Sequence, residues 1–249
     1  MSKYQLTYKP YGETSILIEW PSKIDPDIIK DITLFDEVIR KESKVIETIV
    51  AYNSILVHLK NYKNYSEDHT SKKYFKLFTE HFQNLYQQER NLTDGKQKCW
   101  QIPVCYDLEF GIDLEEMSQI KNLSIKEIIR IHSKTEYLIY FLGFQPGFLY
   151  LGGLDPELHT PRRANPRLRI KKGSIGIGGE QTGIYPQDSA GGWNIIGASP
   201  ITLFDPSKNQ PCFAKAGEYV KFVSIGKGEY LKLQRKVREN KYQPNYSWI

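Results

Sequence analysis

In the first 95 residues, apolar positions follow two periods, one typical of strands and one typical of helices. Stretches rich in β-branched and aromatic residues predict strands at 4–8, 14–20, 45–50 and 54–59. Apolar residues spaced three and four apart predict helices at 25–39 and 69–89. The first helix begins at Asp25-Pro26, where the Asp can cap the helix and the Pro suits its first position. The resulting order, ββαββα, is that of a small open-faced sandwich.

Beyond residue 100, the pattern predicts many short strands and only short helices. A strand is expected at 100–105, and two capping-box patterns, Asp113–Glu116 and Ser124–Glu127, each predict a helix start. Glycine, proline and asparagine separate the remaining β-rich stretches, which lie at 137–142, 167–171, 174–178, 181–185, 193–196, 201–204 and 219–225. Short strands at this spacing are typical of a barrel or a sandwich.

The composition of the chain changes near residue 95. Of the 18 glycines, 12 fall within residues 143–197, whereas residues 1–95 hold only Gly12 and Gly95. Asn, Thr, Asp and Gly cluster at Asn91–Lys98, which favours a linker there. We therefore expect an α+β protein of two domains, a small α/β domain at 1–95 and a mainly β domain, a barrel or a sandwich, at 96–249.

Charge and cysteine content exclude several classes of protein. The formal net charge of +5 is too small to indicate nucleic-acid binding by itself. The three cysteines form no C-x-x-C pair, which argues against a disulfide scaffold or a zinc module and favours a reducing compartment. The longest apolar run, 137–144, is too short for a membrane span, and the first ten residues lack a signal-peptide pattern. We expect a soluble, cytoplasmic protein with neither a nucleic acid nor a membrane as partner.

The glycine-rich run Gly176–Gly183 invites comparison with phosphate-binding loops. Such loops carry Lys-Ser/Thr after the last glycine and open a helix, whereas Ile-Tyr-Pro follows this run and strands flank it. A tight hairpin with positive-φ residues is the better interpretation. Alternation places Gln181, Gly183 and Tyr185 on one face, which gives either a groove with a bare backbone floor or a close sheet contact.

Residues 162–172 hold six basic residues and no acidic residue. Alternation over 167–171 favours an amphipathic strand with a solvated basic face and with Leu168 and Ile170 on the opposite face. Arg162 lies instead in a loop between two prolines, where a guanidinium can be held ready for a carboxylate or a phosphate.

His132 is the candidate general base. It continues the apolar helical row of 125–129, so it is either a satisfied core residue or a catalyst. Its near-neutral reference pKa suits base chemistry. The sequence contains neither the serine-nucleophile motif G-x-S-x-G nor the metal motif H-E-x-x-H.

The aromatic segment 144–153 is the candidate partner interface. It carries Phe144, Phe148 and Tyr150 among glycines, in an expected loop that cannot bury them all. An exposed apolar patch of this kind marks a partner surface.

Several longer motifs occur in order along the second half of the chain. They are Gly143–Leu154, Thr160–Arg162, Gly173–Pro186 and Gly191–Gly197, with shorter matches at Ile102–Tyr106, Asp113–Glu116 and Ile131–Ser133. Together they resemble the family of the 5-oxoprolinase B subunit (PxpB), the histidine-kinase inhibitor KipI and allophanate hydrolase subunit 1. The resemblance is dense over residues 100–206 and implies a cyclophilin-like β-barrel after a small α/β domain.

The resemblance also implies an incomplete enzyme. Family members act with a larger, KipA-like C subunit and with the A subunit of 5-oxoprolinase to cleave 5-oxoproline to glutamate. The assembled enzyme uses ATP and Mg²⁺, and no cofactor is expected on this chain alone. The matching positions are His132, Gln181 and Tyr185 as catalytic residues, and Arg162 and Trp193 as substrate-binding residues. Gly183, on the face of Gln181 and Tyr185, is added to the substrate-binding residues.

Two positions depart from the family pattern. Ala198-Ser199 stands where Arg-Thr is expected, and Ala190 stands where Pro is expected, so the groove lacks one arginine for anion binding. The family also leaves other functions open. One is a KipI-like regulator that binds a sensor histidine kinase, another is part of an allophanate hydrolase, and a third is a peptide-binding module, which rests on the fold alone.

Overall fold

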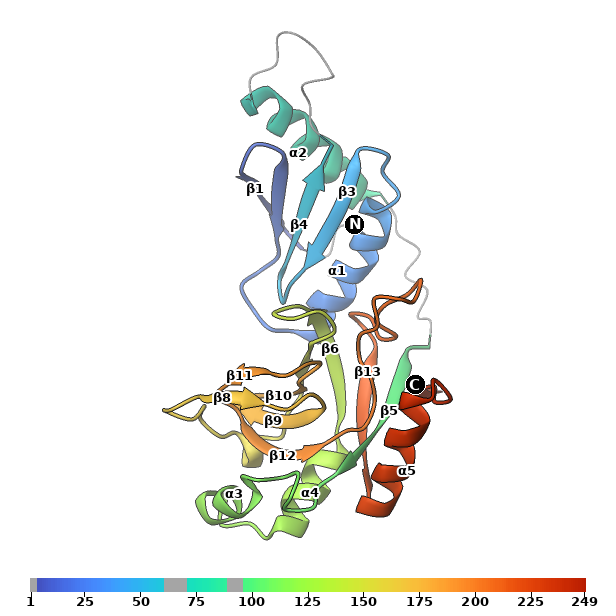
Figure 1. The fold of residues 1–249 in the computed structure, drawn as a ribbon. Coiled ribbons are helices and arrows are strands. Elements are labelled where there is room, and N and C mark those ends of the chain that lie inside the picture. Colours follow the sequence, from blue (N-terminus) through green and yellow to red (C-terminus); the bar gives the residue numbers. More distant parts are fainter. Residues whose placement is uncertain (1–3, 61–70, 89–95) are drawn as a thin grey trace. The chain divides into compact units, whose positions relative to one another are not determined.

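The computed structural model describes residues 4–60, 71–88 and 96–249, without the side chains of 71–73. The chain divides into two compact units, Met1–Gly95 and Lys96–Ile249, which are described separately (Figure 1). Most of the linker expected at Asn91–Lys98 lies outside the described residues.

The N-terminal unit is a four-stranded antiparallel sheet with two helices. Its elements are β1 (Thr7–Tyr11), β2 (Ser15–Glu19), α1 (Pro26–Ile39), β3 (Val45–Val50), β4 (Ser54–Leu59) and α2 (Ser71–Gln87). The strand order is β1-β2-β4-β3, and the expected ββαββα order is confirmed. Asp25 caps α1 by accepting a hydrogen bond from the Asp27 N–H, and Pro26 begins the helix.

The C-terminal unit is a closed barrel of seven strands, which confirms the barrel implied by the family resemblance. The strands are β5 (Lys98–Cys105), β6 (Glu136–Leu142), β7 (Leu149–Gly152), β9 (Ser174–Gly178), β10 (Gln181–Ile184), β12 (Asn194–Ala198) and β13 (Tyr219–Ile225). Their order is β12-β9-β10-β7-β6-β13-β5, and pairing of Ala198 with Cys105 closes the ring. Strands β5 and β13 run parallel, whereas the other neighbours are antiparallel. Strand β14 (Asn245–Trp248) pairs with the first half of β5.

Four helical segments and a two-stranded ribbon complete this unit. They are α3 (Leu114–Lys121), α4 (Ile125–Lys134), η2 (Pro156–Leu158) and α5 (Lys227–Arg238), with the ribbon formed by β8 (Arg167–Ile170) and β11 (Ser189–Gly191). The capping box at Ser124 is present, with Glu127 as its second member. Asp113 occupies the corresponding position before α3, but its side chain makes no capping hydrogen bond. The expectation of a capping box there is wrong, because Asp113 binds other donors, described below.

Several element assignments differ from expectation. The expected strand at 201–204 is wrong, since only an isolated bridge joins Phe204 to Cys212. Ile201 and Leu203 are buried, so they alternate as a strand would without pairing as one. Strand β7 lies within the segment expected as a loop, because it pairs with β6 and β10 across the barrel. Within the described residues, no helix has the length and apolar character needed to cross a membrane.

Candidate functional site

The glycine-rich strands β9 and β10 form a flat surface on which the indole ring of Trp193 packs. They make a tight hairpin with Gly179 at φ +66°, as the sequence predicts. A Cβ added to Gly178 would lie 2.3 Å from the Trp193 ring. A Cβ added to Gly176 or Gly183 would lie 3.0 or 3.1 Å from the same side chain. The glycines therefore let Trp193 lie directly on the sheet, and the expected bare floor is covered.

Trp193 belongs to a buried cluster on the outer face of the barrel. Its other members are Phe148, Ile170, Tyr185 and Ile195. The Trp193 ring makes edge contacts with Phe148 and Tyr185 at centroid distances of 5.6 and 6.2 Å. The structure thus brings together the predicted residues Gly183, Tyr185 and Trp193, in a packed cluster rather than around an open groove.

Tyr185 is buried at the end of this face. Burial raises the pKa of its phenol, while a hydrogen bond from the Trp193 backbone and the nearby charges of Arg162 and Arg167 lower it. The phenol therefore stays protonated at neutral pH. Gln181, at the other end of β10, is only partly buried.

His132 lies on the opposite side of the sheet, inside the barrel. Its Nδ1 is 2.7 Å from the Tyr106 hydroxyl, and its Nε2 is 2.9 Å from the Thr182 hydroxyl. Thr182 donates to the Gly176 carbonyl at 3.0 Å, so its oxygen accepts from His132. The proton consequently sits on Nε2, and Nδ1 accepts from Tyr106. Every polar atom in this buried row has a partner.

Burial lowers the pKa of His132 to about 3, so the imidazole is neutral at physiological pH. Its ring also stacks on Phe222 at a centroid distance of 4.6 Å. Because Thr182 and Tyr185 point to opposite faces of the sheet, His132 does not meet the predicted catalytic Tyr185. These contacts favour the core alternative for His132.

Part of the basic segment is neutralised by acidic residues, while Arg169 and Lys171 are exposed, in agreement with the expected solvated face. Arg167 is paired with Asp113 and Arg169 with Asp188. Leu168, expected to face the core, is 94% exposed, because the ribbon stands outside the barrel. Arg162 is exposed in the loop before the ribbon and forms no ion pair or hydrogen bond with any residue in the described ranges.

The expected partner interface is narrower than the sequence suggested. Phe144 is 69% exposed and adopts φ +65°, a left-handed conformation that bulky residues rarely take. Phe148 is buried in the outer cluster, and Tyr150 is partly buried and stacked on Phe141. Of the three residues named for this surface, Phe144 alone is strongly exposed.

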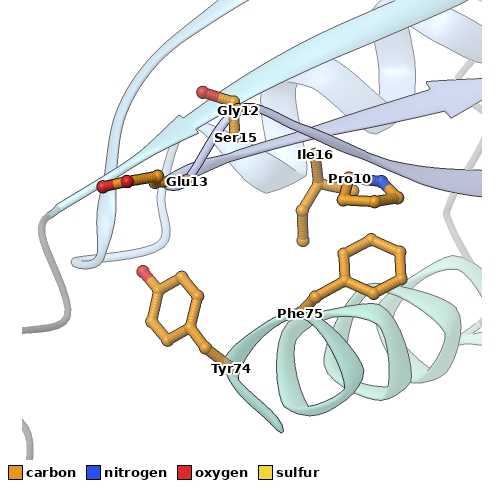
Figure 2. A pocket seen from close by; sticks show the side chains of 7 residues that line it. All are labelled: Pro10, Gly12, Glu13, Ser15, Ile16, Tyr74 and Phe75. Carbon is orange, nitrogen blue, oxygen red and sulfur yellow. The ribbon is translucent and has the colours of Figure 1, made fainter. Parts of the chain in front are cut away.

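The N-terminal unit holds a pocket of about 140 Å³ between the β1–β2 hairpin and α2. Figure 2 shows the rings of Tyr74 and Phe75 on one side and Ile16 and Pro10 on the other. Its walls are mainly apolar, and we assign it no catalytic role. Among the described residues, no group of three or more His, Cys, Asp or Glu side chains is arranged to hold a metal ion.

Asp113 is a polar centre that sequence reasoning misses. The capping pattern assigns it to a helix start, whereas it binds arginines 50 and 54 residues further along the chain. The cluster of arginines near residue 165 indicates that an acidic side chain should lie close to it in the fold. The sequence does not indicate which acidic residue that is.

Comparison with known proteins connects this architecture to one family. Residues 6–214 match the model of the carboxyltransferase domain, subdomain C and D. The chain is 37% identical over 217 residues to the 5-oxoprolinase B subunit of Escherichia coli O157:H7, covering 87% of this chain and 95% of that protein. It is 50% identical over 130 residues to the 5-oxoprolinase B subunit of Bacillus subtilis (strain 168), covering 52% and 54%.

A solved structure supports the same relationship. TTHA0988 is 27% identical with a TM-score of 0.69, and the match covers 85% of this chain and 40% of that one. The resemblance inferred from the sequence motifs is confirmed. The chain belongs to the family of 5-oxoprolinase B subunits, within the carboxyltransferase-domain proteins of subdomain C and D.

Proposed function

We propose that this chain is the B subunit of an ATP-dependent enzyme that opens the lactam of 5-oxoproline to give glutamate. The observation that carries the proposal is the 37% identity to a 5-oxoprolinase B subunit over 95% of that protein's length. The partners are the A subunit and a KipA-like C subunit, and this chain contributes one face of a shared groove.

The arrangement of the candidate residues supports a shared site. His132 is enclosed in the barrel, and Tyr185 packs against Trp193 on the other side of the sheet. Lactam cleavage requires an activated nucleophile and stabilisation of a developing oxyanion. The candidate residues of this chain do not meet around one open site, so we assign part of that machinery to the partner subunits.

Within the shared groove, we assign Arg162 to binding of the substrate carboxylate and Gln181 to the rim. We assign Gly183, Tyr185 and Trp193 to the packed wall, and Phe144 to contact with the C subunit. ATP and Mg²⁺ belong to the assembled enzyme, since the run 176–183 serves as a bed for Trp193 rather than as a phosphate loop. The free state of Cys99, Cys105 and Cys212 supports the expected reducing, cytoplasmic compartment.

Reconstitution tests the proposal. The purified chain is mixed with the A and C subunits, Mg²⁺, ATP and 5-oxoproline, and glutamate and ADP are measured. We expect turnover only when all three proteins are present, and we expect a stable complex of this chain with the C subunit in sizing and light scattering. Turnover by the single chain, or full activity of the A and C subunits without it, would contradict the proposal.

A further inference from the structure

One carboxylate in the barrel unit gathers donors from three segments of the chain. The side chain of Asp113 is only 3% exposed. Arg167 donates to it through both Nη atoms at 2.9 and 2.5 Å, and Arg163 donates through Nη1 at 3.1 Å. The backbone N–H of Ile195 donates to it at 2.6 Å. Asp113 therefore ties the loop before β8, the start of β8 and strand β12 to a single point.

This cluster fixes geometry more than it adds stability. Removing ions from water costs about as much as their mutual attraction returns, so a buried ion pair is a weak source of net stability. Bidentate pairing nevertheless sets the position and plane of a guanidinium. Arg163 is held further by Glu116, at 2.7 Å. Two arginines of the basic segment are thus fixed and neutralised by nearby acids.

The backbone around Arg162 is held on both sides. The Asn194 amide donates to the carbonyl of Pro161 at 2.9 Å, and the N–H of Arg163 donates to the carbonyl of Gly192 at 2.7 Å. The side chain of Arg162 is exposed and has no acidic partner in the part of the chain that the structure describes. Its charge lowers the pKa of the Tyr185 phenol, and the N–H of the next residue bonds to Gly192, the neighbour of Trp193 in the outer cluster.

We propose that Asp113 is a positioning residue that holds Arg162 ready for the carboxylate of the substrate. By binding Arg163 and Arg167, Asp113 leaves the guanidinium of Arg162, whose backbone is held in place, as the one available for an anion, instead of three that compete for it. The Arg162 guanidinium can then form charge-assisted hydrogen bonds with one carboxylate, which fits a substrate that carries a single carboxylate beside its lactam ring. The choice of ligand rests on the proposed function, whereas the positioning role rests on the contacts within this chain.

Arginine-specific labelling tests the positioning role without any activity measurement. The full chain is treated with phenylglyoxal, and modification at each arginine is followed by peptide mass spectrometry. We expect Arg162 to react severalfold faster than Arg163 and Arg167, because ion pairing protects the other two. In Asp113→Asn, Arg167 should become about as reactive as Arg162, whereas Arg163 should gain less because Glu116 still pairs with it. Equal labelling of the three arginines in the unaltered chain, or an unchanged labelling pattern in Asp113→Asn, would overturn the positioning role of Asp113.

Kinetics of the reconstituted complex test the link to Arg162. Asp113→Asn and Arg162→Gln should each raise the KM for 5-oxoproline about tenfold while changing kcat by less than about twofold. The double variant should be no worse than Arg162→Gln alone, because Asp113 acts through Arg162. Additive effects on KM, or a loss confined to kcat, would refute the proposal. The matched control is Asp188→Asn, which releases the exposed Arg169 of the same ribbon and should leave KM unchanged.

A second variant guards against misfolding. If Asp113→Asn melts too low to assemble, Arg167→Gln loosens the same cluster while Asp113 keeps Arg163 and the Ile195 N–H. It should also raise KM, and an unchanged KM would count against the positioning role. Absence of 5-oxoprolinase activity in the unaltered complex would remove the proposed function and its ligand, while the labelling pattern would still decide the role of Asp113.

Discussion

The two faces of strand β10 differ in how their side chains are stabilised. On the inner face, Thr182 joins His132 in a buried row whose donors and acceptors are all matched. On the outer face, Gly183 and Tyr185 pack against Trp193, and the nearby Arg162 is left exposed without an acidic partner in the described ranges. A buried histidine with all its hydrogen bonds made and an exposed arginine beside the packed outer face therefore suit different roles, one structural and one for binding.

The largest effect that tests this comparison is expected at Trp193. Trp193→Ala removes the side chain that fills the outer face and should cost about 3–5 kcal/mol of unfolding free energy. Urea denaturation measures the loss. The control is Trp248→Ala, because Trp248 is 56% exposed on β14 and its removal should cost less than about 1 kcal/mol. Similar costs for the two variants would show that the outer face is not packed as described.

An intermediate effect is expected on the inner face, at His132. The pKa of His132 is about 3 in the folded chain, lowered by burial, against 6.5 for an unperturbed histidine. Between these values the unfolded chain binds a proton that the folded chain does not. Stability should therefore fall as pH drops below 6.5, by up to about 1.4 kcal/mol per pH unit from this residue.

His132→Gln isolates that contribution, because an amide can donate and accept in the same row but does not titrate. At pH 7 the variant should be less stable by about 1–3 kcal/mol, and the difference should shrink as the pH falls toward 4. Thr182→Val, which leaves the imidazole N–H without its acceptor, should lose a similar amount at pH 7. A constant difference across pH would show that folding does not lower the pKa of His132. A stable His132→Gln variant without activity in the assembled enzyme would support a catalytic histidine.

The sequence predicts local structure well wherever the pattern and the pairing agree. Strands β4, β9 and β13 have the expected bounds, since alternating apolar residues there face a core and pair with neighbours. Strand β3 also has the expected bounds, because its β-branched residues pair with β4. Helix α5 was not expected, because Tyr230 is its one buried residue among those described and its apolar signal is weak. Strand β14 was missed because its side chains are all exposed and pairing with β5 defines it.

The candidate site is less predictable because its contacts are distant in the sequence. The apolar row before His132 favours burial, but its partners Tyr106 and Thr182 lie 26 and 50 residues away. Alternation assigned Gly183 and Tyr185 to the right face, yet it does not indicate that Trp193 covers that face. Sequence patterns specify which way a residue points, and only the fold determines what it meets.

The smallest expected effect lies at the turn between β6 and β7, where Phe144 joins the rim of the outer face. A left-handed conformation costs an ordinary residue about 1–2 kcal/mol, and Asn tolerates it better than most. Phe144→Asn and Phe144→Ala both remove the ring and its edge contact with Phe148, so they differ mainly in backbone strain. The Asn variant should be more stable than the Ala variant by about 0.5–1 kcal/mol in urea denaturation.

Both variants should weaken binding to the C subunit about equally, by tenfold or more if the Phe144 ring is a central contact, as measured by titration calorimetry. Equal stability of the two variants would argue that the turn is relaxed, and unchanged binding would remove Phe144 from the partner interface.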